Sequence, residues 1–283
     1  MNEEIRENLL RGSQAYPFVL YHMPYGGNQV AAMLHWQDDV EILSVTSGEL
    51  NLFLDGNLIA LHPGDIVCIN PGQVHSFHSN VPETQLDIFI FPWENLKFAI
   101  ADHDQQKYIS FLADGKLGLP LMFCQNEEQR RLILFAIELQ KQRPPAYEMM
   151  TKAILLMTAA KLAQADAFVS LCPTKNEETC KKILEYIHNH YSYKLTVADI
   201  STEVGISPKY FSTFFCEHFH QHFTDYLRNY RIEQACVLLS NANMSVAEIA
   251  VSVGFGSSSH FIQQFVKSKG ITPLKYRRCF GIG

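Results

Sequence analysis

The run from Cys216 to His222 holds the side chains best suited to bind a metal ion, because it contains one thiol and three imidazoles: Cys216, His218, His220 and His222. Thiolate sulfur and imidazole nitrogen are the usual protein ligands of zinc. The neighbouring residues have helical spacing, however, and a helix turns once every ~3.6 residues, so alternate side chains point in different directions. We therefore expect no metal here and no cofactor in the protein.

The cysteines as a set also argue against a covalent framework. A disulfide scaffold or a zinc ribbon needs closely matched spacings, which these seven residues lack: Cys68, Cys124, Cys172, Cys180, Cys216, Cys236 and Cys279. The first residues, MNEEIRENLLRGSQ, are polar and acidic, and no apolar run is long enough to cross a membrane. We expect a cytoplasmic protein with free thiols.

Length and composition predict about two domains. The chain has 283 residues, 47% hydrophobic and 18% charged, as in globular proteins that bury a core. The net charge of −6 is unevenly placed. Residues 1–174 hold 11 Lys and Arg against 20 Asp and Glu (−9), and residues 175–283 hold 12 against 9 (+3). The C-terminal part is thus the one compatible with phosphate contacts.

Short alternating segments separated by turns characterise residues 16–92. Hydrophobic and polar residues alternate in 41–45 and 50–54, and turn residues follow at Asp55-Gly56-Asn57 and His62-Pro63-Gly64-Asp65. Several strands at this spacing predict a small all-β barrel or sandwich.

Helical spacing replaces this alternation at 127–141 and 147–168. The apolar faces of these helices must pack on the barrel, on each other or on a second copy of the chain, and the sequence leaves these alternatives open. We predict an α+β multidomain protein with these parts: a barrel over 1–100, a helical dimerisation or packing region over 101–170, a linker over 171–178 and an all-α domain over 179–283.

An internal repeat occupies the all-α domain. Val197, Ile200, Val204 and Gly205 recur 49 residues later, and Phe211, Phe215 and Tyr226 recur 50 residues later, so the second copy has one extra residue in its turn. Each copy fits a helix, a tight turn and a second helix. The glycine suits a turn with positive φ, and the two phenylalanines lie on one helical face.

Two such helix-turn-helix units, at about 196–219 and 245–269, predict DNA binding. The phenylalanines anchor the second helix of each unit inward, which leaves its opposite face free to enter a major groove. The alternative is a helical bundle that contacts proteins, because this motif also serves in protein interactions.

Residues 180–280 resemble the DNA-binding domain of the AraC/XylS family of bacterial regulators. The resemblance rests on Ser245-Val-Ala-Glu-Ile-Ala-Val-Ser-Val-Gly-Phe, Phe261-Ile-Gln-Gln-Phe-Val-Lys and Gly270-Ile-Thr-Pro-Leu-Lys-Tyr-Arg. It implies two recognition helices joined by a long helix over about 224–239. It also implies base-reading positions at Lys209, Ser212 and Thr213 and at Ser258, Ser259, Ile262 and Gln263. Gln263 suits an adenine edge.

Basic residues near these helices are candidates for phosphate contacts or for plain solvation: Arg228, Arg231, Lys267, Lys269, Arg277 and Arg278. The first unit departs from the family. His220 stands where a glycine usually follows the recognition helix, and Cys216-Glu217 replaces a commonly basic pair. We expect weaker electrostatic anchoring of that unit.

The β region resembles a cupin barrel, the usual sensor of one AraC subgroup, through His35-Trp-Gln-Asp-Asp-Val-Glu41 and Pro63-Gly-Asp to His75. Metal cupins have His, His, Glu and His at four positions that here read His35, Gln37, Glu41 and His75. Gln is a poor ligand for a transition metal, so we expect no metal. We expect hydrogen bonding to a small sugar-like effector instead, with aromatic walls drawn from Trp36, Phe77, Phe18 and Phe89. The plainer alternative is that the histidines only form hydrogen bonds inside the barrel and bind no effector.

These observations predict a sequence-specific DNA-binding transcription regulator that is controlled by a small effector. The resemblance further implies a homodimer on paired half-sites and, as the commoner outcome in the family, an activator that contacts RNA polymerase; the sequence leaves repression open. The alternative is a cupin-type metal-dependent enzyme with a helical appendage. Gln37 argues against an enzyme, and that alternative leaves the resemblance of the C-terminal hundred residues unexplained.

Overall fold

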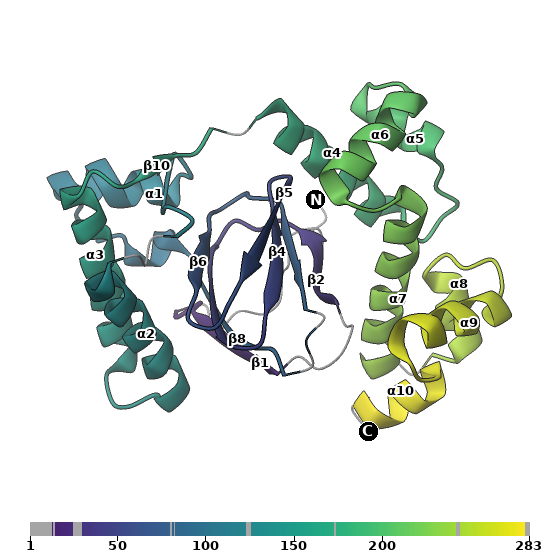
Figure 1. Ribbon diagram of the computed structural model, residues 1–283, viewed down its shortest axis with the longest axis horizontal. Helices are drawn as coiled ribbons and strands as arrows, with labels where there is room; N and C mark the ends of the chain where they lie inside the picture. The colour runs from purple at the N-terminus through teal and green to yellow at the C-terminus, as the bar shows by residue number, and fades with distance from the viewer. Residues whose placement is uncertain are drawn as a thin grey trace. The chain divides into compact units, whose positions relative to one another are not determined.

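The computed structural model describes residues 13, 15–24, 30–79, 81, 83–122, 126–172, 174–241 and 244–280. Cys124 lies outside the described residues. The chain divides into two compact units, one ending at Glu177 and one beginning at Glu178 (Figure 1). Among the described residues, no helix is both long and apolar enough to cross a membrane.

The N-terminal unit contains two four-stranded antiparallel sheets. The first has the order β1-β8-β3-β6 and the second the order β2-β7-β4-β5. Their bounds are β1 Val19–Pro24, β2 Val30–His35, β3 Val40–Ser47, β4 Leu50–Leu54, β5 Asn57–Leu61, β6 Ile66–Ile69, β7 His75–His78 and β8 Gln85–Phe91. Leu43, Val45 and Ile88 of the first sheet pack against Leu52 and Phe77 of the second. The cupin-like β-rich region is therefore confirmed, although the described strands form two facing sheets and not a closed barrel.

Two long helices cover the outer face of the first sheet. Ile133, Ala136 and Ile137 of α2 (Glu127–Gln142), together with the apolar face of α3 (Tyr147–Gln164), share a core cluster with Ile42 and Phe89. This packing explains why six consecutive residues of β3 are buried. When both faces of a strand are covered, its side chains do not alternate between the core and the solvent. The two helices thus pack on their own sheet and on each other.

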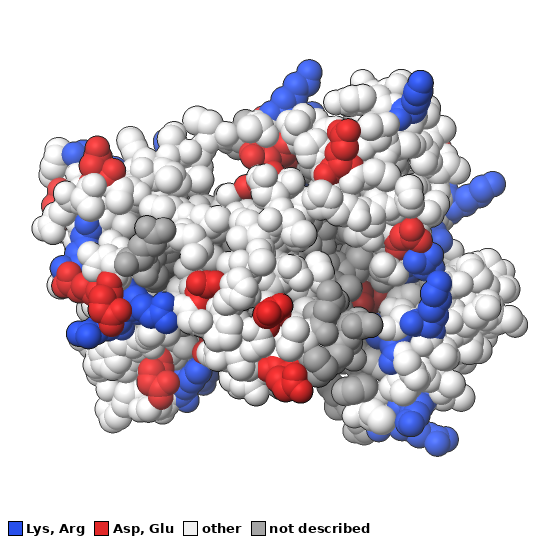
Figure 2. All heavy atoms as spheres, viewed as in Figure 1, with Lys and Arg blue, Asp and Glu red and all other residues white. Residues whose placement is uncertain are grey.

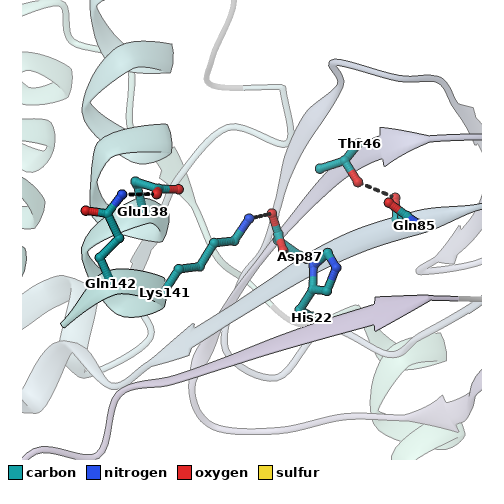
Figure 3. A network of polar contacts seen from close by, with 7 residues as sticks. All are labelled: His22, Thr46, Gln85, Asp87, Glu138, Lys141 and Gln142. Carbon is teal, nitrogen blue, oxygen red and sulfur yellow. Dashed lines mark hydrogen bonds and ion pairs between the residues drawn. The ribbon is translucent and has the colours of Figure 1, made fainter.

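A polar network ties α2 to the sheet beneath it (Figure 3). The Asp87 side chain on β8 is only 3% exposed and accepts hydrogen bonds from Lys141 Nζ at 2.8 Å and His22 Nδ1 at 2.8 Å. A buried carboxylate is stable only when it is paired in this way. The network therefore fixes the position of α2 along the strands.

Shorter elements join the sheets to the helices. They are the 3-10 helix Trp93–Leu96, the π-helix Gln105–Ile109, α1 Ser110–Ala113, β9 Leu117–Gly118 and β10 Val169–Ser170. Strand β9 pairs antiparallel with β10, which is the last strand before the C-terminal unit.

The C-terminal unit is helical. Its elements are α4 Lys175–His190, α5 Val197–Val204, α6 Pro208–Phe219, α7 Phe223–Asn241, α8 Val246–Ser252, α9 Ser258–Lys269 and α10 Pro273–Phe280. Helix α4 starts inside the segment predicted as a linker over 171–178. Figure 1 shows α5 and α6 at one end of α7, and α8, α9 and α10 at the other. Helix α7 therefore occupies the place expected of the joining helix.

Candidate DNA-binding and effector sites

The first helix of each helix-turn-helix unit begins with a reciprocal cap. Thr196 accepts from the backbone N–H of Asp199, whose carboxylate accepts from the N–H of Thr196. Ser245 and Glu248 do the same for α8. Each cap satisfies donors that a helix N-terminus leaves open. Hydrogen bonding also lowers the pKa of Glu248 below its ordinary value, which keeps its carboxylate charged.

The second helix of each unit is capped by a serine and anchored by a phenylalanine pair. Ser207 accepts from the N–H of Tyr210 in α6, and Ser257 accepts from the N–H of His260 in α9. The anchoring residues are fully buried: Phe211, Phe215, Phe261 and Phe265. Because they lie four residues apart, they turn one face of each helix to the core and the other to solvent.

The predicted base-reading residues lie on the solvent-facing sides of these helices. Exposed positions are Lys209, Ser212 and Thr213 on α6 and Ser259, Ile262 and Gln263 on α9, while Ser258 is half-buried. Tyr210, 53% exposed, and His260 lie on the same faces but were missing from the predicted set. They occupy the same position of the repeat, so alignment of the two copies could have found them.

Of the basic residues predicted to contact phosphate, some are exposed to solvent and others form ion pairs within the protein. Lys267 is exposed. Arg228 forms an ion pair with Asp225 at 2.7 Å, and Lys269 donates to both carboxylate oxygens of Glu233. On the face drawn in Figure 2, Lys and Arg side chains gather over the C-terminal helices.

Arg231 is the clearest internal use of a basic residue. Its Nε donates to the carbonyl of Tyr191 at 2.8 Å, and its Nη2 donates to the carbonyl of Tyr193 at 2.8 Å. Burial also lowers the pKa of its guanidinium from the ordinary value. These contacts give Arg231 a role in holding the chain after α4 against α7.

The Cys216–His222 run does not assemble a metal-binding set among the described residues. Cys216 Sγ lies 3.2 Å from His222 Nδ1, but His218 packs on the ring of Phe214 with centroids 4.2 Å apart. Burial lowers the pKa of His218. Cys216, His218 and His222 therefore make local contacts at the end of α6, while His220 is exposed.

The four cupin-motif residues do come together between the two sheets. Gln37 Nε2 donates to Glu41 Oε2 at 2.8 Å, and His75 Nε2 lies 3.5 Å from the same oxygen. His35 pairs with His75 across β2 and β7, with ring centroids 4.2 Å apart. Gln37 and Glu41 are 2% exposed and His75 is fully buried. We call His35, Gln37, Glu41 and His75 the polar cluster.

Backbone carbonyls fix both imidazoles of the polar cluster. His35 Nδ1 lies 2.7 Å from the carbonyl of Met33, and His75 Nδ1 lies 2.9 Å from that of Gln73. A carbonyl only accepts, so Nδ1 is the protonated nitrogen of each ring. In a neutral ring Nε2 is then an acceptor, as in histidines that bind metals.

The geometry of the cluster fits a divalent metal with three protein ligands. The donor atoms of His35, Glu41 and His75 all lie within 4.8 Å of one another, and imidazole nitrogen and carboxylate oxygen are ligands that zinc accepts. Gln37 stands where a fourth ligand would come and holds Glu41 instead. The same acceptor-rich set also suits a ligand with several hydroxyl donors.

The predicted aromatic walls are only partly present. Phe77 is buried between the sheets. Trp36 is half-buried and lies between His35 and Gln37 in the sequence. Phe18 and Phe89 instead join the core under α2 and α3. These two residues therefore do not line the space between the sheets, and for Phe89 the reason is that alternation along β8 turns it to the outer face of its sheet.

Known proteins resemble both units. Residues 200–279 match a family described as a helix-turn-helix domain, and residues 19–91 match one described as a cupin domain. The predicted combination of an AraC-type helix-turn-helix domain with a cupin domain is therefore confirmed. The chain is 25% identical over 256 residues to the HTH-type transcriptional regulator YdeC of Bacillus subtilis. The aligned residues make up 87% of this chain and 86% of that protein.

Other known proteins resemble part or all of the chain. The Salmonella typhimurium regulatory protein PocR is 34% identical over 106 residues, which are 38% of this chain and 35% of that protein. The structure of ToxT from Vibrio cholerae is similar in fold, with a TM-score of 0.50, 17% identity and coverage of 95% of this chain and 99% of that one. The relatives carry the names of transcription regulators, which favours a regulator over the alternative of a cupin enzyme.

Proposed function

We propose that this AraC-family regulator is an activator whose polar cluster binds a small, sugar-like effector and thereby changes how the chain binds DNA. The observation that carries the proposal is the burial of Gln37, Glu41 and His75, next to half-buried His35, between the apolar inner faces of two sheets. Buried polar groups are costly unless they are satisfied, and such a set placed among apolar residues is typical of ligand sites.

The names of relatives support both finer points. HTH-type transcriptional activator RhaR of Mannheimia succiniciproducens is 22% identical over 261 residues. The melibiose operon regulatory protein of Escherichia coli is 31% identical over 97 residues. We infer a polyol or sugar for this chain because hydroxyl groups can donate to Glu41 and to imidazole nitrogens and can accept from Gln37.

On DNA, we propose that α6 and α9 read bases in successive major-groove segments. Gln263 would pair with an adenine edge, and Ser259, Ser212 and Thr213 accept several partners. Lys209 reaches a base or a phosphate, and Lys267 contacts a phosphate. The internal contacts of Arg231 and Lys269 make them weaker candidates than Lys267.

We propose a homodimer that binds paired half-sites and, as an activator, contacts RNA polymerase. Apolar side chains stay exposed on the outer sides of α2 and α3, including Phe135 at 48% and Met149 at 74%. Such a surface favours a second copy of the chain. Sedimentation of the wild type and of a Phe135→Lys, Met149→Lys variant tests this: a wild-type monomer at micromolar concentration would contradict it.

The test of the regulator begins with selection of duplexes from a random pool by the full chain at moderate salt. The affinity for the selected duplex is then measured with each of a panel of sugars and polyols. We expect one of them to change it at least fivefold, since allosteric coupling is commonly ~5–150-fold. Gln37→Leu should abolish the change, and Thr84→Val, which alters another buried polar side chain, should keep it. No response to any of the panel would reject a sugar effector.

A second candidate effector is a divalent transition metal, favoured by the fit of His35, Glu41 and His75. Bound metal would supply positive charge to these acceptors and draw β2, β3 and β7 together. Equilibrium dialysis with zinc and the visible spectrum with cobalt test this in wild type and in His75→Gln. Binding that His75→Gln leaves intact would reject this site.

A further inference from the structure

The segment that contains β9 covers the edge of the first sheet at β6. Strand β6 lies at the edge of the order β1-β8-β3-β6, and edge strands present unpaired backbone groups. Here the N–H of Cys68 on β6 donates to the carbonyl of Leu121 at 2.9 Å. Residues 117–121 therefore run beside β6 without forming a regular strand with it.

Asn70 fastens this segment with two hydrogen bonds. Its Nδ2 donates to the carbonyl of Leu119 at 2.9 Å, and its Oδ1 accepts from the N–H of Leu119 at 2.8 Å. The side chain, 3% exposed, thus imitates a neighbouring peptide group. The fit is tight, because a Cβ added at Gly118 would lie 2.6 Å from Asn70 Oδ1.

The other side of Asn70 leads to the polar cluster. Its backbone N–H donates to Gln73 Oε1 at 2.7 Å, and the carbonyl of Gln73 holds His75 Nδ1 at 2.9 Å. The N–H of Gly72 donates to the carbonyl of Gln37 at 2.7 Å. Residues 70–73 are therefore hydrogen-bonded to two members of the cluster, Gln37 and His75.

The segment held by Asn70 also holds the end of the N-terminal unit. Strand β9 pairs with β10, with Gly118 opposite Val169, and the N–H of Leu171 donates to the carbonyl of Lys116 at 3.0 Å. Helix α4 begins at Lys175. One chain of hydrogen bonds thus runs from His75 through Gln73, Asn70 and Leu119 to the strand that leads into the DNA-binding unit.

We propose that Asn70 is a positioning residue that transmits the state of the polar cluster to β10 and so to the entry of α4. The proposal rests on the proposed function, because it assigns the route by which an effector at the cluster acts. A ligand that shifts His75 or Gln37 moves residues 70–75, and Asn70 passes this movement to Leu119 and β9. The effector changes DNA affinity only if it binds one conformation of these residues more tightly than the other, and if the two conformations bind DNA differently.

Hydrogen exchange in the full chain tests the route without any effector. Asn70→Leu keeps the side-chain shape and removes both bonds to Leu119, and Asn70→Ala removes both bonds together with the side chain. We expect both variants to speed exchange of the Leu171 amide about tenfold or more, since local opening governs exchange. Thr84→Val, matched for burial and loss of a polar group, should leave Leu171 unchanged. Equal exchange of Leu171 in all four proteins would overturn the route.

A double-mutant cycle then tests transmission to DNA. His75→Gln perturbs the cluster, and we expect it to change affinity for the selected duplex about fivefold in the wild-type background. In the Asn70→Leu background the change should fall below about twofold. The same change in both backgrounds, or no change in either, would overturn transmission through Asn70. Failure of every sugar and metal to affect the wild type would reject the proposed effectors and is read separately from this cycle.

Discussion

The two helix-turn-helix units share a plan but differ at both ends of the recognition helix. In the second unit Gly254 packs against the chain after α4: a Cβ there would lie 2.6 Å from the carbonyl oxygen of Tyr191 and 3.0 Å from Cζ of Arg231. A Cβ added at Gly205 of the first unit would meet no heavy atom of the described residues within 4 Å, apart from its chain neighbours and the backbone of its own helix. The turn requires a glycine in both units, and in the second unit a close contact with another part of the chain requires it as well.

The far ends differ in charge and in backbone. Helix α9 ends with Lys267 and a Gly270 cap at φ 72°, whereas α6 carries Glu217 and ends at His220 with φ 49°. A left-handed backbone costs a residue with a Cβ about 1 kcal/mol. The second unit therefore combines a closely packed turn with a basic last turn of its recognition helix, while the first has a strained helix end and an acidic side chain.

The largest expected difference concerns the turn glycines. Gly254→Ala should lower the free energy of unfolding by about 3 kcal/mol, because it adds a steric clash to backbone strain. Gly205→Ala should cost about 1 kcal/mol from strain alone. Urea unfolding of the full chain, followed by helical circular dichroism, measures both. Equal losses would show that the contact with Tyr191 does not distinguish the units.

Next in size is the loss of base contacts. The double change Ser259→Ala, Gln263→Ala should weaken binding to the selected duplex by about 2 kcal/mol and relax the preferred sequence in one half of the site. Ser212→Ala, Thr213→Ala should do the same for the other half, with a smaller loss. Repeating the selection with each variant checks this. A preferred sequence that survives both changes would exclude these faces as the readers.

A smaller effect is expected from exchanging the charges at the repeat positions 217 and 267. Lys267→Glu should lower DNA affinity for every sequence alike and reduce the salt dependence by about one counterion. Glu217→Lys should raise affinity, since it removes a charge that repels phosphate. Titrations at several salt concentrations measure both. If Glu217→Lys has no effect, α6 does not approach the DNA backbone at this end.

The ends of the recognition helices predict a still smaller change in stability. His220→Gly should raise the free energy of unfolding by about 0.5 kcal/mol, because glycine accepts φ 49° without a Cβ clash. Gly270→His should lower it by about 1 kcal/mol. Thermal unfolding of both variants beside the wild type gives the comparison. Destabilisation by His220→Gly would mean that the imidazole makes a contact worth more than the strain.

The smallest expected effect is a pH dependence confined to the first unit. Burial lowers the pKa of His218 in the folded chain, so the unfolded chain binds a proton more readily. The stability from neutral His218 is complete above the ordinary pKa of about 6.5 and is lost as pH falls through the lower, folded pKa. His218→Ser, which copies Ser268 of the second unit, should reduce the loss between pH 7 and pH 5. An unchanged pH profile would show that other groups cause it.

Much of the C-terminal unit could be predicted from sequence because its signals are local. The caps at Thr196 and Ser245, the turn glycines and the phenylalanine pairs lie within a few residues of the features they determine. The outward faces of α6 and α9 followed from helical spacing alone. The uses of Arg231 and Lys269 did not, because their partners lie on other helices.

In the N-terminal unit, alternation and turn residues predicted strands and turns, and the resemblance to a cupin barrel predicted the four residues of the polar cluster. Three other features depend on packing between distant segments: His35, Glu41 and His75 meet within 4.8 Å, Phe89 faces the helices, and Asn70 reaches Leu119 across 49 residues of sequence. The physical reason is the same in each case. Alternation specifies that a strand has two faces, but which face meets the other sheet depends on how distant segments pack.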